Sequence, residues 1–104
     1  MEQKEQALRT ELAELRSKLE DPAIFSTKEY PKLAKRQNTL EAIVGLFDEF
    51  RALKQQTEEA ETMAASDDPE LAELAKAELE ELAENRAAND AALAEALVPK
   101  DPND

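Results

Sequence analysis

Leucines recur along the first twenty residues at intervals of four, three and four, at positions Leu8, Leu12, Leu15 and Leu19. This spacing places apolar side chains on one face of a helix and leaves the other faces polar. The pattern predicts a first helix over about residues 3–20. Asp21-Pro22 ends it, because proline lacks an amide hydrogen and pushes the preceding residue out of the helical conformation.

A second and longer apolar pattern runs from about Leu33 to Ala64 with the same three- and four-residue spacing. The start of this helix is open by about four residues. Ser26 and Glu29 match a capping box, in which each side chain bonds the other residue's amide, whereas Pro31 favours a start near Pro31 itself. Gly45 interrupts the pattern at a cost of about 1 kcal/mol relative to alanine, and either allows another helix to approach closely or is simply tolerated. The strongest apolar positions are Leu40, Ile43, Val44, Phe47 and Phe50.

Asp68-Pro69 predicts the start of a third helix, because Asp can cap free amides and proline is preorganised for the first helical position. Two polar residues, Arg86 and Asn89, interrupt its apolar stripe, and such interruptions can fix the register between helices. The other members of the stripe are Leu71, Leu74, Ala75, Leu79, Leu82, Leu93 and Leu97.

The second and third helices are each about 30 residues long and are joined by only a few residues, so they must run antiparallel. The predicted fold class is all-α, an elongated three-helix bundle. In it, helices two and three form a long antiparallel hairpin, and the shorter first helix packs at one end. We expect that end to lie near Leu33, Leu40 and the C-terminal end of the third helix. Residues 1–98 are expected to form one helical domain and residues 99–104 the start of a linker.

Charge is distributed unevenly along the 104 residues, whose net charge is −12. Residues 1–54 hold ten basic and ten acidic side chains, whereas residues 55–104 hold three and fifteen. The acidic half would repel phosphate, so any contact with nucleic acid should involve the first half. The one basic cluster there is either a phosphate-contacting patch for RNA or a solvated helix face. It consists of Lys28, Lys32, Lys35 and Arg36.

The composition excludes most catalytic chemistry. Without histidine or cysteine there is no Ser-His dyad, thiol nucleophile or zinc site, and one glycine cannot build a phosphate-cradling loop. Adjacent glutamates such as Glu80-Glu81 point in different directions on a helix and face solvent. We therefore expect neither an enzyme nor a metal or cofactor site. The lack of cysteine, signal peptide and long apolar run indicates a cytoplasmic protein outside the membrane.

Two short motifs of this chain carry a family resemblance. The octapeptide Leu97-Val98-Pro99-Lys100-Asp101-Pro102-Asn103-Asp104 is similar to the segment that joins the N-terminal helical domain of the release factor 1 family, which belongs to the bacterial class I peptide chain release factors, to its decoding and catalytic body. That family usually has two leucines before Pro-Lys-Asp-Pro, where this chain has Leu97-Val98. The turn Asp67-Asp68-Pro69-Glu70-Leu71 also sits where the family commonly opens its last helix of this domain.

The resemblance implies a translation termination factor. Such a factor recognises UAA and UAG through a Pro-x-Thr motif and triggers peptidyl-tRNA hydrolysis through Gly-Gly-Gln, and neither motif occurs here. The resemblance further implies that this domain is the non-catalytic part and docks toward the stalk base of the large ribosomal subunit. Its partners would be the ribosome and the remaining domains of the same factor, not DNA. Lys28, Lys32, Lys35 and Arg36 would then be candidate ribosome contacts.

Four alternatives are weighed at this level. A structural coiled-coil adaptor explains the periodicity equally well, but predicts a concentration-dependent dimer without ribosome affinity, whereas a docking domain is expected to be a monomer. A helical arm that binds tRNA, like that of bacterial seryl-tRNA synthetases, should be basic at the turn between its two long helices. That turn, residues 64–68, is acidic here and would repel phosphate, which argues against such an arm. The sister factor for UAA and UGA lacks Pro-Lys-Asp-Pro-Asn-Asp in its linker. An organellar relative of the family also stays open.

Overall fold

The computed structural model describes residues 2–98, and this range contains three α-helices, one 3₁₀-helix and no strand. The α-helices are α1 (Glu2–Leu19), α2 (Tyr30–Ala64) and α3 (Pro69–Ala96), and the 3₁₀-helix is η1 (Pro22–Ser26). The predicted all-α class is confirmed. The chain forms two compact units, Met1–Gly45 and Leu46–Asp104, and α2 contributes one half to each.

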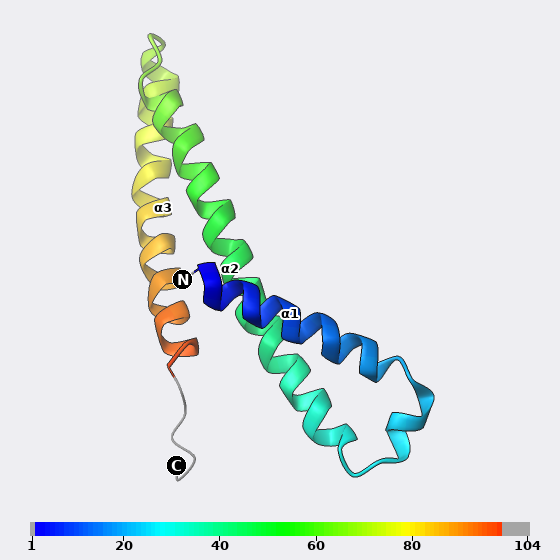
Figure 1. Ribbon diagram of the computed structural model, residues 1–104. Helices are drawn as coiled ribbons and strands as arrows, with labels where there is room; N and C mark the ends of the chain where they lie inside the picture. The colour runs from blue at the N-terminus through cyan, green and yellow to red at the C-terminus, as the bar shows by residue number, and fades with distance from the viewer. Residues whose placement is uncertain (1, 99–104) are drawn as a thin grey trace. The chain divides into compact units, whose positions relative to one another are not determined.

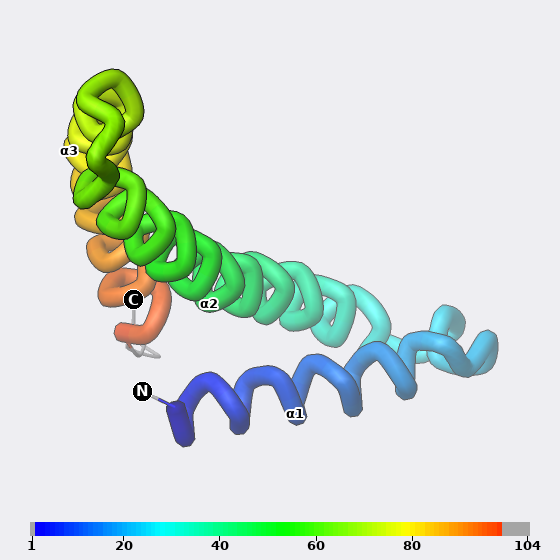
Figure 2. The backbone as a smooth tube through the Cα atoms, turned by 90° about the horizontal axis from the view of Figure 1, so that it is seen from above, coloured from blue at the N-terminus to red at the C-terminus, as the bar shows by residue number. Residues whose placement is uncertain are grey.

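In the first unit α1 runs antiparallel to the first half of α2 (Figures 1 and 2). The leucine stripe of α1 supplies half of the core. Leu12 and Leu15 are buried with Leu40 of α2, and three partly buried side chains, Leu8, Leu33 and Val44, pack against them. The predicted packing of the first helix near Leu33 and Leu40 is therefore confirmed.

The connection between α1 and α2 corrects one prediction. Ser26 does not cap a helix, because it lies inside η1 and its hydroxyl donates to the Ala23 carbonyl at 3.1 Å. η1 is capped instead by Asp21, whose Oδ1 accepts from the Ala23 amide at 3.0 Å. α2 begins at Tyr30, so Pro31 falls in its first turn, where the missing amide costs no helical bond. The second of the two predicted starts is the one observed.

In the second unit α3 runs antiparallel to the second half of α2 (Figure 1), which confirms the predicted hairpin. Leu53 and Ala60 of α2 are buried with Leu82 of α3, and Leu79 packs against them. The start of α3 is also as predicted, with Pro69 in the first turn and Asp68 Oδ1 accepting from the Glu70 amide at 3.0 Å.

Two leucines assigned to the buried stripe of α3 are exposed. Leu74 is 69% exposed and Leu71 is 39% exposed, whereas Ala72 and Ala75 are buried. The buried residues of α3 continue from Ala72 at intervals of three, seven, seven and four, at Ala75, Leu82, Asn89 and Leu93. Leu71 precedes that series by one residue, which rotates it about 100° around the helix. The sequence-based assignment of Leu71 and Leu74 to the core is therefore wrong, since alanine occupies those buried positions.

The middle of α2 carries two local features. Asn89 of α3 is 3% exposed, and its Nδ2 donates to the Leu46 carbonyl at 3.0 Å. This bond joins α3 to α2, and the role of Asn89 in fixing helix register stays a prediction. A Cβ added at Gly45 would meet no atom within 4 Å, so the glycine does not serve close approach of a described helix.

Three further expectations stay predictions. The expected linker at residues 99–104, and with it most of the octapeptide, lies outside the described residues. The placement of the first helix near the end of the third is untested, and so is the assignment of residues 1–98 to one domain. Within the described range, no helix is long and apolar enough to cross a membrane.

Candidate functional site

A groove between α1 and the first half of α2 is the main candidate site. Its volume is about 550 Å³, and it lies entirely within the first compact unit. Four of its residues are basic, two are acidic and three are uncharged. We call it the lysine groove. Its lining is Glu11, Glu14, Leu15 and Lys18 from α1, with Lys32, Leu33, Lys35, Arg36 and Thr39 from α2.

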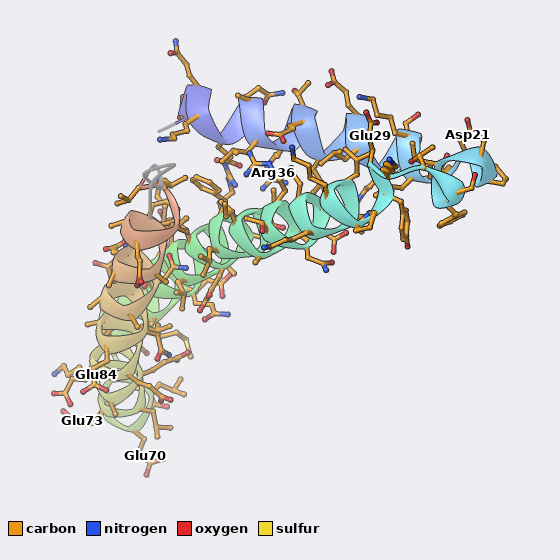
Figure 3. All side chains as sticks on the ribbon, turned by 90° about the horizontal axis from the view of Figure 1, so that it is seen from below. Asp21, Glu29, Arg36, Glu70, Glu73 and Glu84 are labelled. Carbon is orange, nitrogen blue, oxygen red and sulfur yellow. The ribbon has the colours of Figure 1, made fainter. Side chains whose placement is uncertain are left out.

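Arg36 is tied to α1 by a bidentate ion pair and lies between the two helices (Figure 3). Its Nε donates to Glu11 Oε2 at 2.6 Å, and its Nη2 donates to Glu11 Oε1 at 2.8 Å. These hydrogen bonds hold the pKa of the Glu11 carboxyl below its ordinary value, against a smaller opposing effect of burial. They also raise the pKa of Arg36. Arg36 therefore joins two helices and is not a free cation.

A second cross-helix ion pair supports the same arrangement. Arg16 Nη2 lies 3.4 Å from Glu41 Oε1, and the Gln37 amide donates to that oxygen at 3.2 Å. Both residues of this pair are exposed, so it contributes little to stability on its own. Together with the Glu11–Arg36 pair, however, it limits sliding of α1 along α2. The walls of the lysine groove are thus held in a fixed register.

The predicted basic cluster divides into three parts in the structure. Lys32 and Lys35 line the lysine groove, Arg36 lines it but is paired with Glu11, and Lys28 lies in the turn before α2 and does not line it. Lys18 of α1 completes the groove, and sequence reasoning missed it. The available signal was its spacing from Glu11, Glu14 and Leu15, which puts it on the α1 face turned toward an antiparallel partner.

The lysines of the groove have no acidic partner in the described part of the chain. The ion pairs there involve other cations, and Glu14, four residues before Lys18, forms none with it. Arg36 and Glu11 neutralise each other, so Lys18, Lys32 and Lys35 face only the Glu14 carboxylate. The groove is locally positive although the whole chain carries −12.

A second surface lies at the connecting end of the α2–α3 hairpin. It is a shallow depression lined by Pro69, Glu70, Glu73 and Leu74, which we call the hairpin-end patch. Figure 3 labels the two glutamates at this end of α3. The leucine is largely exposed, and Glu73 pairs with Lys76 at 3.6 Å. The patch is therefore apolar at Leu74 and acidic around it.

Among the described residues no group of carboxylates is arranged to hold a metal ion. The carboxylates that occur in pairs along α2 and α3, including Glu58-Glu59 and Glu80-Glu81, are exposed on the helix surfaces. An exposed glutamate that lines no cavity keeps most of its solvent shell, and Glu59 in addition accepts a hydrogen bond from the Gln55 amide at 3.0 Å.

A scan against protein families matches residues 8–104 to the PCRF domain. Because the match covers most of the chain, the chain belongs to the PCRF domain family. Within it, curated relatives named peptide chain release factor 1 are similar to this chain. The relative from Thermus thermophilus is 39% identical over 93% of this chain, and that from Geotalea uraniireducens is 38% identical over all of it. The protein from Solidesulfovibrio magneticus is 35% identical over 95% of it.

The chain spans 27–29% of the length of these relatives. No solved structure matches it significantly. The family membership confirms the resemblance drawn from the octapeptide and the Asp68-Pro69 turn. It also favours a termination-factor domain over a freestanding coiled-coil adaptor, which the periodicity alone left open.

Proposed function

We propose that the chain is the N-terminal helical domain of a release factor 1 type protein, that it acts in the cytoplasm without catalysis of its own, and that it docks the factor on the ribosome. The observation that carries the proposal is the PCRF match over residues 8–104 together with relatives named peptide chain release factor 1. In this account, recognition of UAA and UAG and hydrolysis of peptidyl-tRNA belong to the rest of the factor.

The residue inventory supports a docking role without chemistry. The 104 residues contain no histidine, no cysteine and one glycine, so a Gly-Gly-Gln tripeptide cannot occur among them. The described carboxylates hold no metal-type cluster. A domain with long amphipathic helices and no reactive constellation fits positioning of a larger protein.

The hairpin-end patch supports a protein contact at the stalk base of the large subunit. Leu74 is 69% exposed beside Glu70 and Glu73. An exposed leucine ringed by carboxylates suits a partner that presents an apolar pocket within a basic surface, because burial supplies affinity and opposite charge steers the encounter. Ribosomal proteins that bind RNA carry such basic surfaces.

Co-sedimentation with 70S ribosomes at low salt tests the proposal. We expect the 104-residue chain to pellet with ribosomes, to behave as a monomer in solution, and to be displaced by intact release factor 1. Leu74→Ser should weaken binding, whereas Val98→Ser, at a residue that is 63% exposed and outside the patch, should not. Absence of pelleting above background, or a concentration-dependent dimer that ignores ribosomes, would refute the docking role.

A further inference from the structure

The lysine groove holds three lysines that form no ion pair within residues 2–98, in a chain that has nearly twice as many acidic as basic residues. Lys32 and Lys35 are three residues apart and therefore share a face of α2. Lys18 approaches the same groove from α1. The last turn of α1 favours a cation at Lys18, whereas the first turn of α2 disfavours one at Lys32, so the helix dipoles account for only part of this gathering.

The groove is preorganised by the Glu11–Arg36 pair. Because the Arg36 guanidinium bridges α1 and α2 at 2.6 and 2.8 Å, the two walls are fixed relative to each other before any ligand arrives. Leu15 and Leu33 form its base, and Leu15 belongs to the buried core. The lysines therefore project from a rigid support, which lowers the entropy lost on binding.

The chemistry of the groove selects a polyanion with charges along a chain. Lysine is a compact point charge on a flexible stem, so it can reach phosphate oxygens at varied positions without the fixed bidentate geometry that arginine imposes. None of the lining residues is aromatic, so no base can stack there. Such a groove would contact a nucleic-acid backbone and read no sequence.

We infer that Lys18, Lys32 and Lys35 form a binding site for the phosphate backbone of ribosomal RNA. Arg36 holds α1 and α2 together, and the Glu14 carboxylate weakens the attraction of the groove for phosphate. This inference rests on the proposed function, because the ribosome supplies the RNA. It differs from the cluster expected from sequence in adding Lys18, in removing Lys28 and in assigning Arg36 a different role.

Two triple variants with equal charge change test the site. Lys18, Lys32 and Lys35 are replaced by glutamine in the first, and Lys4, Lys28 and Lys54, none of which lines either the groove or the hairpin-end patch, in the second. All six positions are exposed, so both proteins should fold, which circular dichroism checks. A third variant, Glu14→Gln, removes the opposing charge. Binding of each to 70S ribosomes and to protein-free 23S RNA is titrated from about 50 to about 200 mM salt.

We expect the groove triple to bind both probes at least roughly tenfold more weakly at the lowest salt concentration, and its slope of log K against log salt to be shallower by about 2. The control triple should lose much less affinity. Glu14→Gln should bind more tightly than the unaltered chain, and this gain cannot arise from misfolding.

The outcomes separate the two claims. If the unaltered chain binds no ribosomes, the proposed function fails. If it binds them but the groove triple binds equally well, or if both triples lose affinity equally, the groove inference fails and docking stands. If the groove triple loses ribosome affinity while the unaltered chain ignores protein-free RNA, the ligand is an acidic protein and the RNA assignment is overturned.

Discussion

Glu11 and Arg36 illustrate how one pair of side chains can decide the role of a charged cluster. The pair spans two helices with two short hydrogen bonds, yet both side chains are about half exposed, at 40% and 45%. Solvent screening limits such a pair to about 0.5–1 kcal/mol of folding free energy. Its larger effect is positional, because it aligns α1 with α2 at the level of the lysine groove.

We predict that Glu11→Gln lowers the free energy of unfolding at pH 7 by up to about 1 kcal/mol. The pKa of Glu11 is lower in the folded chain than its ordinary value of 4.5, so the folded state gains from ionisation. That gain is fully present above about pH 4.5–5 and is lost as the pH falls through the lowered value. Urea titrations from pH 7 to 3 should show the two proteins converging in acid.

Glu58→Gln, a change at an exposed site on α2, is the matched control and should leave stability nearly unchanged at every pH. A difference between Glu11→Gln and the parent that persists at pH 3 would rule out the ion pair as its origin.

Asn89 is a buried polar residue of α3 that affects stability. Its Nδ2 is satisfied by the Leu46 carbonyl, but its buried Oδ1 has no hydrogen-bond partner in the structure. A buried polar atom without a partner costs about 1–3 kcal/mol. The residue is thus a stability cost on one side and a hydrogen-bonded link between α3 and α2 on the other.

We predict that Asn89→Leu raises the free energy of unfolding by about 1 kcal/mol, because it removes the unpartnered oxygen and adds apolar burial. Asn89→Asp, which keeps the size but buries a charge, should lower it by more than that at pH 7. Denaturant unfolding measures both, and light scattering reports whether the leucine variant loses its unique assembly state. A destabilised leucine variant would show that Oδ1 has a partner in solution.

At the scale of elements, α2 is a continuous helix of 35 residues that contains one glycine, Gly45. Gly45 is exposed, its φ is not positive, and a Cβ would meet nothing within 4 Å. The position therefore has no steric need for glycine. It carries the backbone entropy cost of glycine within a helix without a packing benefit.

We predict that Gly45→Ala stabilises the protein by about 0.5–1 kcal/mol. Ala52→Gly, at an exposed site on the same helix, should destabilise it by a similar amount, and the double variant should be close to neutral. Thermal unfolding compares the three. If Gly45→Ala is neutral or harmful while Ala52→Gly behaves as expected, the glycine has a function that the static structure does not contain.

Sequence reasoning succeeded where a local rule acts alone. Asp68 and Pro69 define the start of α3 through capping and proline geometry, and the structure has the same cap. It failed where packing against another helix determines which face is buried. Leu74 is apolar and near the stripe, but the buried face passes through Ala72 and Ala75 instead, because residue size at the hairpin end cannot be inferred from one helix alone.

The candidate site shows the same division. Periodicity placed Lys32 and Lys35 on one helix face, and both line the groove. The pairing of Arg36 with Glu11, twenty-five residues away, and the arrival of Lys18 depend on the register between α1 and α2. Register follows from leucine packing across the interface, which a single sequence leaves undefined. The predicted capping box at Ser26 is wrong for a related reason. The Ser26 hydroxyl donates to the Ala23 carbonyl within η1 and so does not cap α2.

At the scale of the whole molecule, charge is divided between the units. The sequence of residues 1–45 carries eight basic and eight acidic side chains, so the net charge of −12 arises from residues 46–104. The basic groove lies in the neutral unit, and the hairpin-end patch lies in the acidic one. Under the proposed function, the first unit would present its basic groove to RNA and the second its acidic patch to protein.

The most direct test of the docking account is a domain exchange. The matching segment of Thermus thermophilus release factor 1 is replaced by this chain, and peptide release is measured on ribosomes stopped at UAA, against the intact factor and a factor lacking the segment. The account predicts that the chimaera needs a lower concentration for half-maximal release than the deleted factor, while the isolated chain releases no peptide. A folded chimaera that performs no better than the deleted factor would contradict it.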